Sequence, residues 1–99
     1  MGASNSTEKI KIKIDSQFVD IIGRMAIDDP CKQTISNLYK TFIDKYNGLD
    51  LNTVKEIRIT LTEMLNRTFK SDKDYIYLKF KSLMHSLTLL QNNLSKNKK

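Results

Sequence analysis

The amino-acid sequence predicts a mainly α-helical protein, a compact bundle of about four helices. Apolar side chains recur at helical spacing through most of the 99 residues. Residues that cap or break helices interrupt this pattern, and the connections between them are short, which favours antiparallel neighbours in a bundle. We expect the helices at residues 16–27, 30–46, 50–66 and 71–94.

The N-terminal residues follow a different pattern. Residues 1–8, MGASNSTE, are small and polar, so we expect a flexible arm there. Isoleucine alternates with lysine in residues 9–14, which is typical of a short strand with one apolar and one basic side. A lone strand is unstable and requires another segment, another copy or a surface. The expected organisation is one helical domain at 9–94 followed by a basic tail at 95–99.

The first two helices have distinct boundaries. Apolar residues from Phe18 to Met25 follow a helical period, and Pro30 prevents that helix from continuing. Asp29 and Pro30 also form the start of the second helix, as its N-cap and first helical residue. Gly48 stands where a left-handed C-terminal cap of the second helix would lie.

The third helix has a competing interpretation. Asp50 or Asn52 can cap it, and its apolar residues then form one stripe from which Ile59 faces away. Residues 55–62, KEIRITLT, are nevertheless rich in β-branched types and alternate as a strand would. The alternative prediction is an α+β fold with strands at 9–14, 55–62 and 75–80.

The fourth helix carries the longest apolar pattern. Its start, Ser71 to Asp74, resembles a capping box. A helix over 71–94 is about 35 Å long, more than so small a bundle requires, so we expect its apolar seam to bind a protein partner or a second copy of the chain. The seam has the alternating spacing of a coiled coil and consists of Ile76, Phe80, Leu83, Leu87, Leu90 and Leu94.

The start of the chain fits an acylation motif. Met1-Gly2-Ala3-Ser4-Asn5-Ser6 matches M-G-x-x-x-[ST], in which removal of methionine exposes Gly2 as the myristoyl acceptor and Ser6 completes the recognition. One myristoyl chain gives only marginal membrane binding, about 10⁴ M⁻¹. Stable anchoring therefore requires a second signal.

Three lysines close to this motif can supply the second signal. Lys9, Lys11 and Lys13 follow the motif directly, and each lysine near an anionic leaflet contributes about 1 kcal/mol. The sequence therefore predicts an anionic membrane surface as a partner. The alternative is that these lysines only protect the edge of a strand from aggregation.

Other chemistry has little support in the sequence. The chain has one cysteine, Cys31, and one histidine, His85, and it shows no phosphate-binding glycine loop, metal-ligand spacing or nucleophile elbow. We expect no enzyme activity and no cofactor other than a covalent myristoyl group. The net charge of +6 is compatible with nucleic acid, but most aromatic residues fall on the apolar stripes, so weak nucleic-acid binding ranks third.

The layout of Gly2, Ser6 and the lysines after them resembles that of the small myristoylated matrix proteins of enveloped viruses. The resemblance implies a viral protein at the cytoplasmic face of a membrane, although the tryptophan and dense Lys/Arg loop of retroviral matrix domains are absent. The predicted function is a non-enzymatic, membrane-peripheral helical module, matrix-like or an adaptor, that binds the inner membrane surface and a protein partner or itself. The alternative is a soluble helical regulator or inhibitor that acts through dimerisation and protein contacts.

Overall fold

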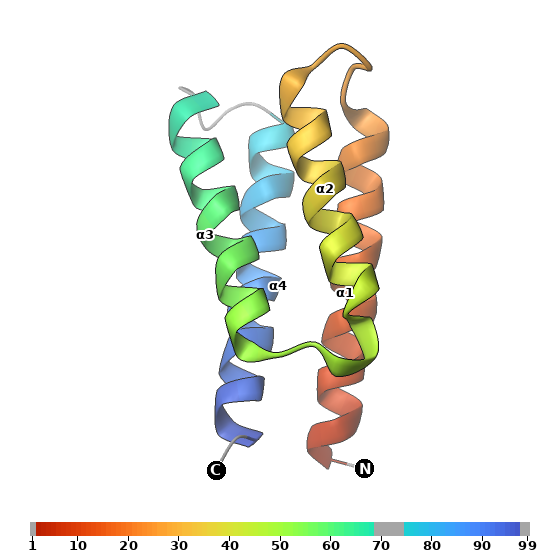
Figure 1. The fold of residues 1–99 in the computed structure, drawn as a ribbon, viewed down its shortest axis with the longest axis vertical. Helices are drawn as coiled ribbons and strands as arrows, with labels where there is room; N and C mark the ends of the chain where they lie inside the picture. The colour runs from red at the N-terminus through yellow and green to blue at the C-terminus, as the bar shows by residue number, and fades with distance from the viewer. Residues whose placement is uncertain (1, 69–74, 98–99) are drawn as a thin grey trace.

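Four α-helices alternate in direction along the bundle (Figure 1). A computed structural model describes residues 2–68 and 75–97, with side chains from Thr7 to Arg67 and from Tyr75 to Lys96. The predicted mainly α bundle is confirmed. The α+β alternative is wrong, since all three of its expected strands are helical. The helices are α1 (Gly2–Arg24), α2 (Pro30–Asp44), α3 (Leu51–Thr68) and α4 (Tyr75–Asn97).

Helix α1 runs without interruption from Gly2 to Arg24. It replaces the strand expected at 9–14 and the flexible arm expected at 1–8, of which Met1 lies outside the described residues. Among isoleucines that alternate with lysines, every second isoleucine also falls at the four-residue spacing of one helix face. Ile14 is fully buried, whereas Ile12 is 57% exposed. Tertiary packing therefore selects the helix, because the bundle offers this segment an apolar seam and no strand partner. The buried seam of α1 comprises Lys11, Ile14, Phe18 and Ile21, and the buried Met25 follows directly after the helix.

Helix α2 begins as expected and ends earlier. The Asp29 carboxylate accepts a hydrogen bond from the backbone N–H of Cys31 at 2.9 Å, and Pro30 is the first helical residue. The helix stops at Asp44, and a short 3-10 helix, η1 (Tyr46–Gly48), follows. The N–H of Gly48 donates to the Lys45 carbonyl at 3.0 Å. This tighter turn takes the place of the left-handed cap expected at Gly48.

Helix α3 resolves the ambiguity of residues 55–62. Asp50 accepts a hydrogen bond from the Thr53 N–H at 3.3 Å, as a cap should. Ile57 and Leu61 are buried and Ile59 is 50% exposed. A strand would have placed these three side chains on one side, so the burial pattern is that of the helix.

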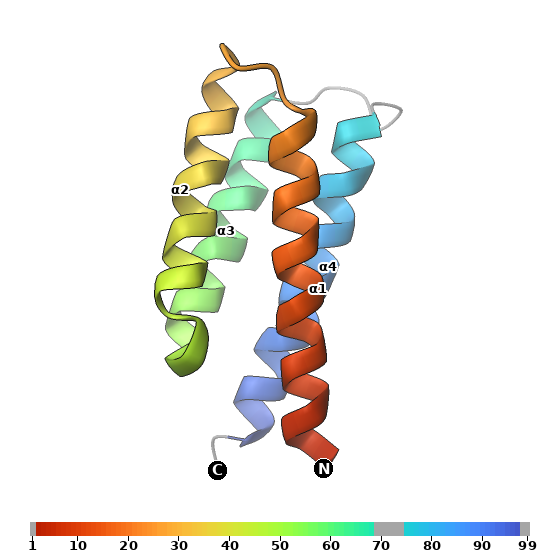
Figure 2. The same cartoon turned by 90° about the vertical axis from the view of Figure 1, so that its right-hand side faces the viewer.

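Helix α4 extends to Asn97, so the first part of the basic tail expected at 95–99 is helical. Its expected start at 71–74 lies outside the described residues. Helices α1 and α4 run side by side, and their paired ends reach beyond the connection between α2 and α3 (Figures 1 and 2). The start of α1 at Gly2 and the end of α4 at Asn97 consequently lie at the same end of the bundle (Figure 1).

The expected partner-binding seam of α4 forms the core of the bundle. Four of its six side chains have no exposed surface, and Ile76 and Leu94 pack against the core from its edge. Leucine side chains buried within one chain are unavailable to another, so the seam's expected role in partner binding is corrected here. The four fully buried side chains are Phe80, Leu83, Leu87 and Leu90.

Candidate functional site

The predicted acylation and membrane-surface residues occupy the first half of α1. Gly2 and Ser6 lie in its first turns, where the structure describes the backbone alone. Lys9 and Lys13, one helical turn apart, are exposed. Lys11 is 9% exposed and points into the bundle. The three lysines therefore do not form one surface group as the strand interpretation implied.

Lys11 has a structural role. Its ammonium donates a hydrogen bond to the backbone carbonyl of Tyr46 at 2.7 Å and lies 4.8 Å from the centre of the Tyr46 ring. The aliphatic stem fills a position in the α1 seam, while the charge satisfies a carbonyl of η1. Lys11 thus ties α1 to the turn after α2 and is withdrawn from any membrane.

The carboxylates in this half of α1 are turned toward α2. Asp15 accepts a hydrogen bond from the Tyr39 hydroxyl at 2.7 Å, and Glu8 accepts one from the Tyr46 hydroxyl at 3.2 Å. The bond to Asp15 raises the pKa of Tyr39, and burial, with the charge of Glu8, raises the pKa of Tyr46. The side of α1 that faces α4 consequently keeps the positive charge of Lys13.

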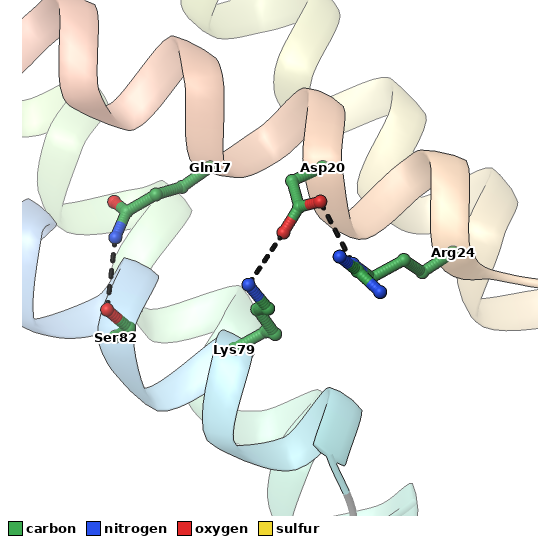
Figure 3. A network of polar contacts seen from close by, with 5 residues as sticks. All are labelled: Gln17, Asp20, Arg24, Lys79 and Ser82. Carbon is green, nitrogen blue, oxygen red and sulfur yellow. Dashed lines mark hydrogen bonds and ion pairs between the residues drawn. The ribbon is translucent and has the colours of Figure 1, made fainter.

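Polar contacts define how α1 and α4 are aligned (Figure 3). Gln17 donates to the Ser82 hydroxyl at 3.1 Å, and Lys79 pairs with Asp20 at 3.0 Å. Both pairs follow the same antiparallel register, because Asp20 lies three residues after Gln17 in α1 and Lys79 lies three residues before Ser82 in α4. Two turns further toward the N-terminus of α1, this register brings Leu89 level with Ile10.

The same register brings the last helical lysine beside the start of the chain. Lys96 lies fourteen residues beyond Ser82 and is level with the residue fourteen before Gln17, Ala3. Lys96 is exposed. The sequence predicts a basic tail at this position; the signal that would have placed Lys96 beside α1 is the antiparallel pairing of the first and last helices.

Acidification is expected to weaken the contact at Asp20. The hydrogen bond from Lys79, followed by that from Arg24 at 2.9 Å, lowers the pKa of the Asp20 carboxyl below its ordinary value. A carboxyl whose pKa is lower in the folded chain stabilises the fold above its unfolded pKa, and this stabilisation disappears as the pH falls through the folded pKa. Asp20→Asn should therefore reduce the acid sensitivity of the urea midpoint below about pH 4.

The control for this prediction is Asp44→Asn, which alters an exposed carboxyl at the end of α2. The variant should leave the contacts of Asp20 in place, and with them the acid sensitivity that depends on Asp20. The contribution of Asp20 should also shrink in high salt, because the group is exposed and its ion pairs are screened. Equal acid sensitivity in Asp20→Asn and the original chain would contradict the role assigned to these contacts.

Other side chains with potential chemistry lie apart from this region. Cys31 lines a groove of about 230 Å³ between the start of α2 and the end of α3, with Met64 and Arg67 on the opposite wall. His85 is exposed on α4. Among residues 2–68 and 75–97, no group of three or more His, Cys, Asp or Glu side chains is arranged to hold a metal ion.

Within the described part of the chain, each helix is too short or too polar to span a bilayer. Comparison of the chain with protein-family models, with curated proteins and with solved structures finds no match.

Proposed function

We propose that the protein is a membrane-peripheral helical bundle that binds an anionic bilayer through myristoylated Gly2 and a group of exposed lysines. The lysine group consists of Lys9, Lys13 and Lys96. In this proposal the bundle serves as a small matrix-like or adaptor module without enzymatic activity, at the cytoplasmic face of a membrane.

The observation that carries this proposal is the position of these residues at one end of the fold. Gly2 begins α1 and Lys96 lies in the last turn of α4. The start of α1 and the end of α4 lie at the same end of the bundle (Figure 2). Lys9 and Lys13 follow about two and three turns further along α1. An acyl chain on Gly2 would therefore enter the bilayer level with Lys96, with Lys9 and Lys13 further along α1.

The two signals complement each other energetically. A single myristoyl chain binds only marginally, about 10⁴ M⁻¹, and each lysine near an anionic leaflet adds about 1 kcal/mol. This attraction fades over a Debye length of about 8 Å at physiological salt. Lys96 is level with the acyl end, whereas Lys9 and Lys13 lie about 10 and 16 Å along α1, so their contributions depend on how the bundle is oriented.

The alternative of a soluble dimeric regulator required a free strand edge and an exposed apolar seam, and both segments are part of the helical bundle itself. Residues 9–14 form part of α1 and offer no strand edge, and the α4 seam is core. The contacts among the described residues likewise add no support for weak nucleic-acid binding. Dimerisation remains an outcome of the ultracentrifugation experiment in the Discussion.

Gly2→Ala is expected to release the protein from membranes in the cells that normally make it. The original chain should lose Met1 and gain about 210 Da, the mass of a myristoyl group. The Gly2→Ala variant should show no such gain and should move to the soluble fraction. Intact mass spectrometry and membrane flotation measure the two effects.

Gly23→Ala is the matched control, since it makes the same change in the same helix. A methyl group at Gly23 meets open space, so this variant should be acylated and membrane-bound like the original chain. An original chain without the added mass, or equal flotation of Gly2→Ala and Gly23→Ala, would refute acylation as the anchor.

A further inference from the structure

Leu89 is a large apolar side chain on the outside of the bundle. It lies on α4, is 41% exposed, and follows Ser82 by two turns on the same face of the helix. Lys13 precedes Gln17 by one turn on the matching face of α1. Because Gln17 bonds Ser82, Leu89 and Lys13 lie on the same outer edge of the α1–α4 pair.

Positive charge surrounds this leucine. Leu89 is level with Ile10, so Lys9 and Lys13 stand on either side of it along the bundle axis, and Lys96 follows two turns further along α4. Each of the three lysines is exposed. An aliphatic side chain between cations matches a bilayer surface, where apolar groups enter the interface and lysines meet anionic headgroups.

The described length of α4 has no acidic side chain, and the acidic side chains of α1 contact other residues of the bundle. Residues 75–97 contain no aspartate or glutamate. Glu8 and Asp15 bond tyrosines of α2 and η1, and Asp20 is paired with Lys79 and Arg24. Among the described residues, the half of the outer α1–α4 edge nearest the termini therefore carries Lys9, Lys13 and Lys96, while Glu8 and Asp15 lie on the side of α1 that contacts these tyrosines.

We infer that the bundle lies against an anionic phospholipid bilayer along the terminal half of the α1–α4 edge, with Leu89 inserted at the interface. The inference rests on the proposed function and specifies its orientation. It brings Lys9 and Lys13 to the headgroups together with Lys96, which an upright bundle standing on its termini would not do.

Leu78 offers an internal control for Leu89. It is 53% exposed and lies three turns earlier on the same outer face of α4. The α1–α4 register makes it level with Ile21, beyond the Asp20 carboxylate and toward the opposite end of the bundle. A bilayer on the terminal half of the edge should leave Leu78 in water.

Tryptophan reporters distinguish these two positions. The chain has no tryptophan, so Leu89→Trp and Leu78→Trp each introduce a single fluorophore at an exposed position. With unacylated protein and vesicles of phosphatidylserine and phosphatidylcholine in equal parts, Leu89→Trp emission should shift to the blue and be quenched by brominated lipid. Leu78→Trp emission should not change. With phosphatidylcholine alone, binding of both should be weaker by on the order of a hundredfold, about fivefold for each lysine.

Co-sedimentation with the same vesicles separates the two possible failures. If both variants sediment but Leu89→Trp shows no shift, or Leu78→Trp shifts equally, the assigned edge is wrong while membrane binding by the protein stands. If neither variant nor the original chain sediments, the edge has no affinity of its own and the inference fails. The proposed anchor is then judged separately by the mass and flotation of the Gly2 variant.

Discussion

Replacement of Leu87 by aspartate is expected to unfold the protein. Leu87 has no exposed surface and stands in the middle of the α4 seam, between Leu83 and Leu90. The substitution removes a buried aliphatic side chain, which alone costs about 2–5 kcal/mol, and adds a carboxylate without a partner in the core. The free energy of unfolding of a domain of this size is about 5–15 kcal/mol. Circular dichroism and a urea titration should show a largely unfolded chain.

Leu78→Asp is the matched control, because it makes the same change on the same helix at a side chain that is 53% exposed. We expect its urea midpoint to stay close to that of the original chain. A Leu87→Asp protein that stays folded but changes its mass in solution would instead mean that the α4 seam joins two chains. Analytical ultracentrifugation of each variant distinguishes these results.

Lys11→Glu should have the second largest effect. The new carboxylate would replace the ammonium that donates to the Tyr46 carbonyl and would face the negative face of the Tyr46 ring. A charged carboxylate and a carbonyl oxygen with a partial negative charge would then meet in a position that is 9% exposed. We expect a loss of about 3 kcal/mol in the free energy of unfolding, the usual consequence of breaking a buried charge contact.

Lys9→Glu provides the comparison, since it reverses the same charge two residues away on the exposed side of α1. Its effect on the free energy of unfolding should stay within about 0.5 kcal/mol. The difference between the variants is itself a test of the helix at residues 9–14. In a strand these two lysines would share one side, and their substitutions would have similar effects.

The helices that local signals delimit were predictable from the sequence. Asp29 and Pro30 begin α2 because capping and a fixed φ angle act within a few residues, and Asp50 caps α3 for the same reason. The alternation in residues 9–14 was misinterpreted because isoleucine at every second position includes the helical positions as well. The choice between the two periods depended on α4 and η1, which lie far away in the sequence.

The candidate site was predictable only in part. The motif at Gly2 and the adjacent lysines are local patterns, but the separation of Lys11 from Lys9 and Lys13 follows from the helical rotation of α1. Leu89 joins the site through the α1–α4 register, which no local pattern contains. Long-range pairing is thus the information that the residue pattern lacked.

The pairing of the first helix with the last also has a consequence in time. The Gln17 and Ser82 side chains that align α1 with α4 are 65 residues apart in the chain. A ribosome adding about 5–20 residues per second completes α4 several seconds after Gly2 has left the exit tunnel. During that interval α1 has no α4 to pack against, so the acylation proposed at Gly2 would act on the nascent chain before the bundle closes.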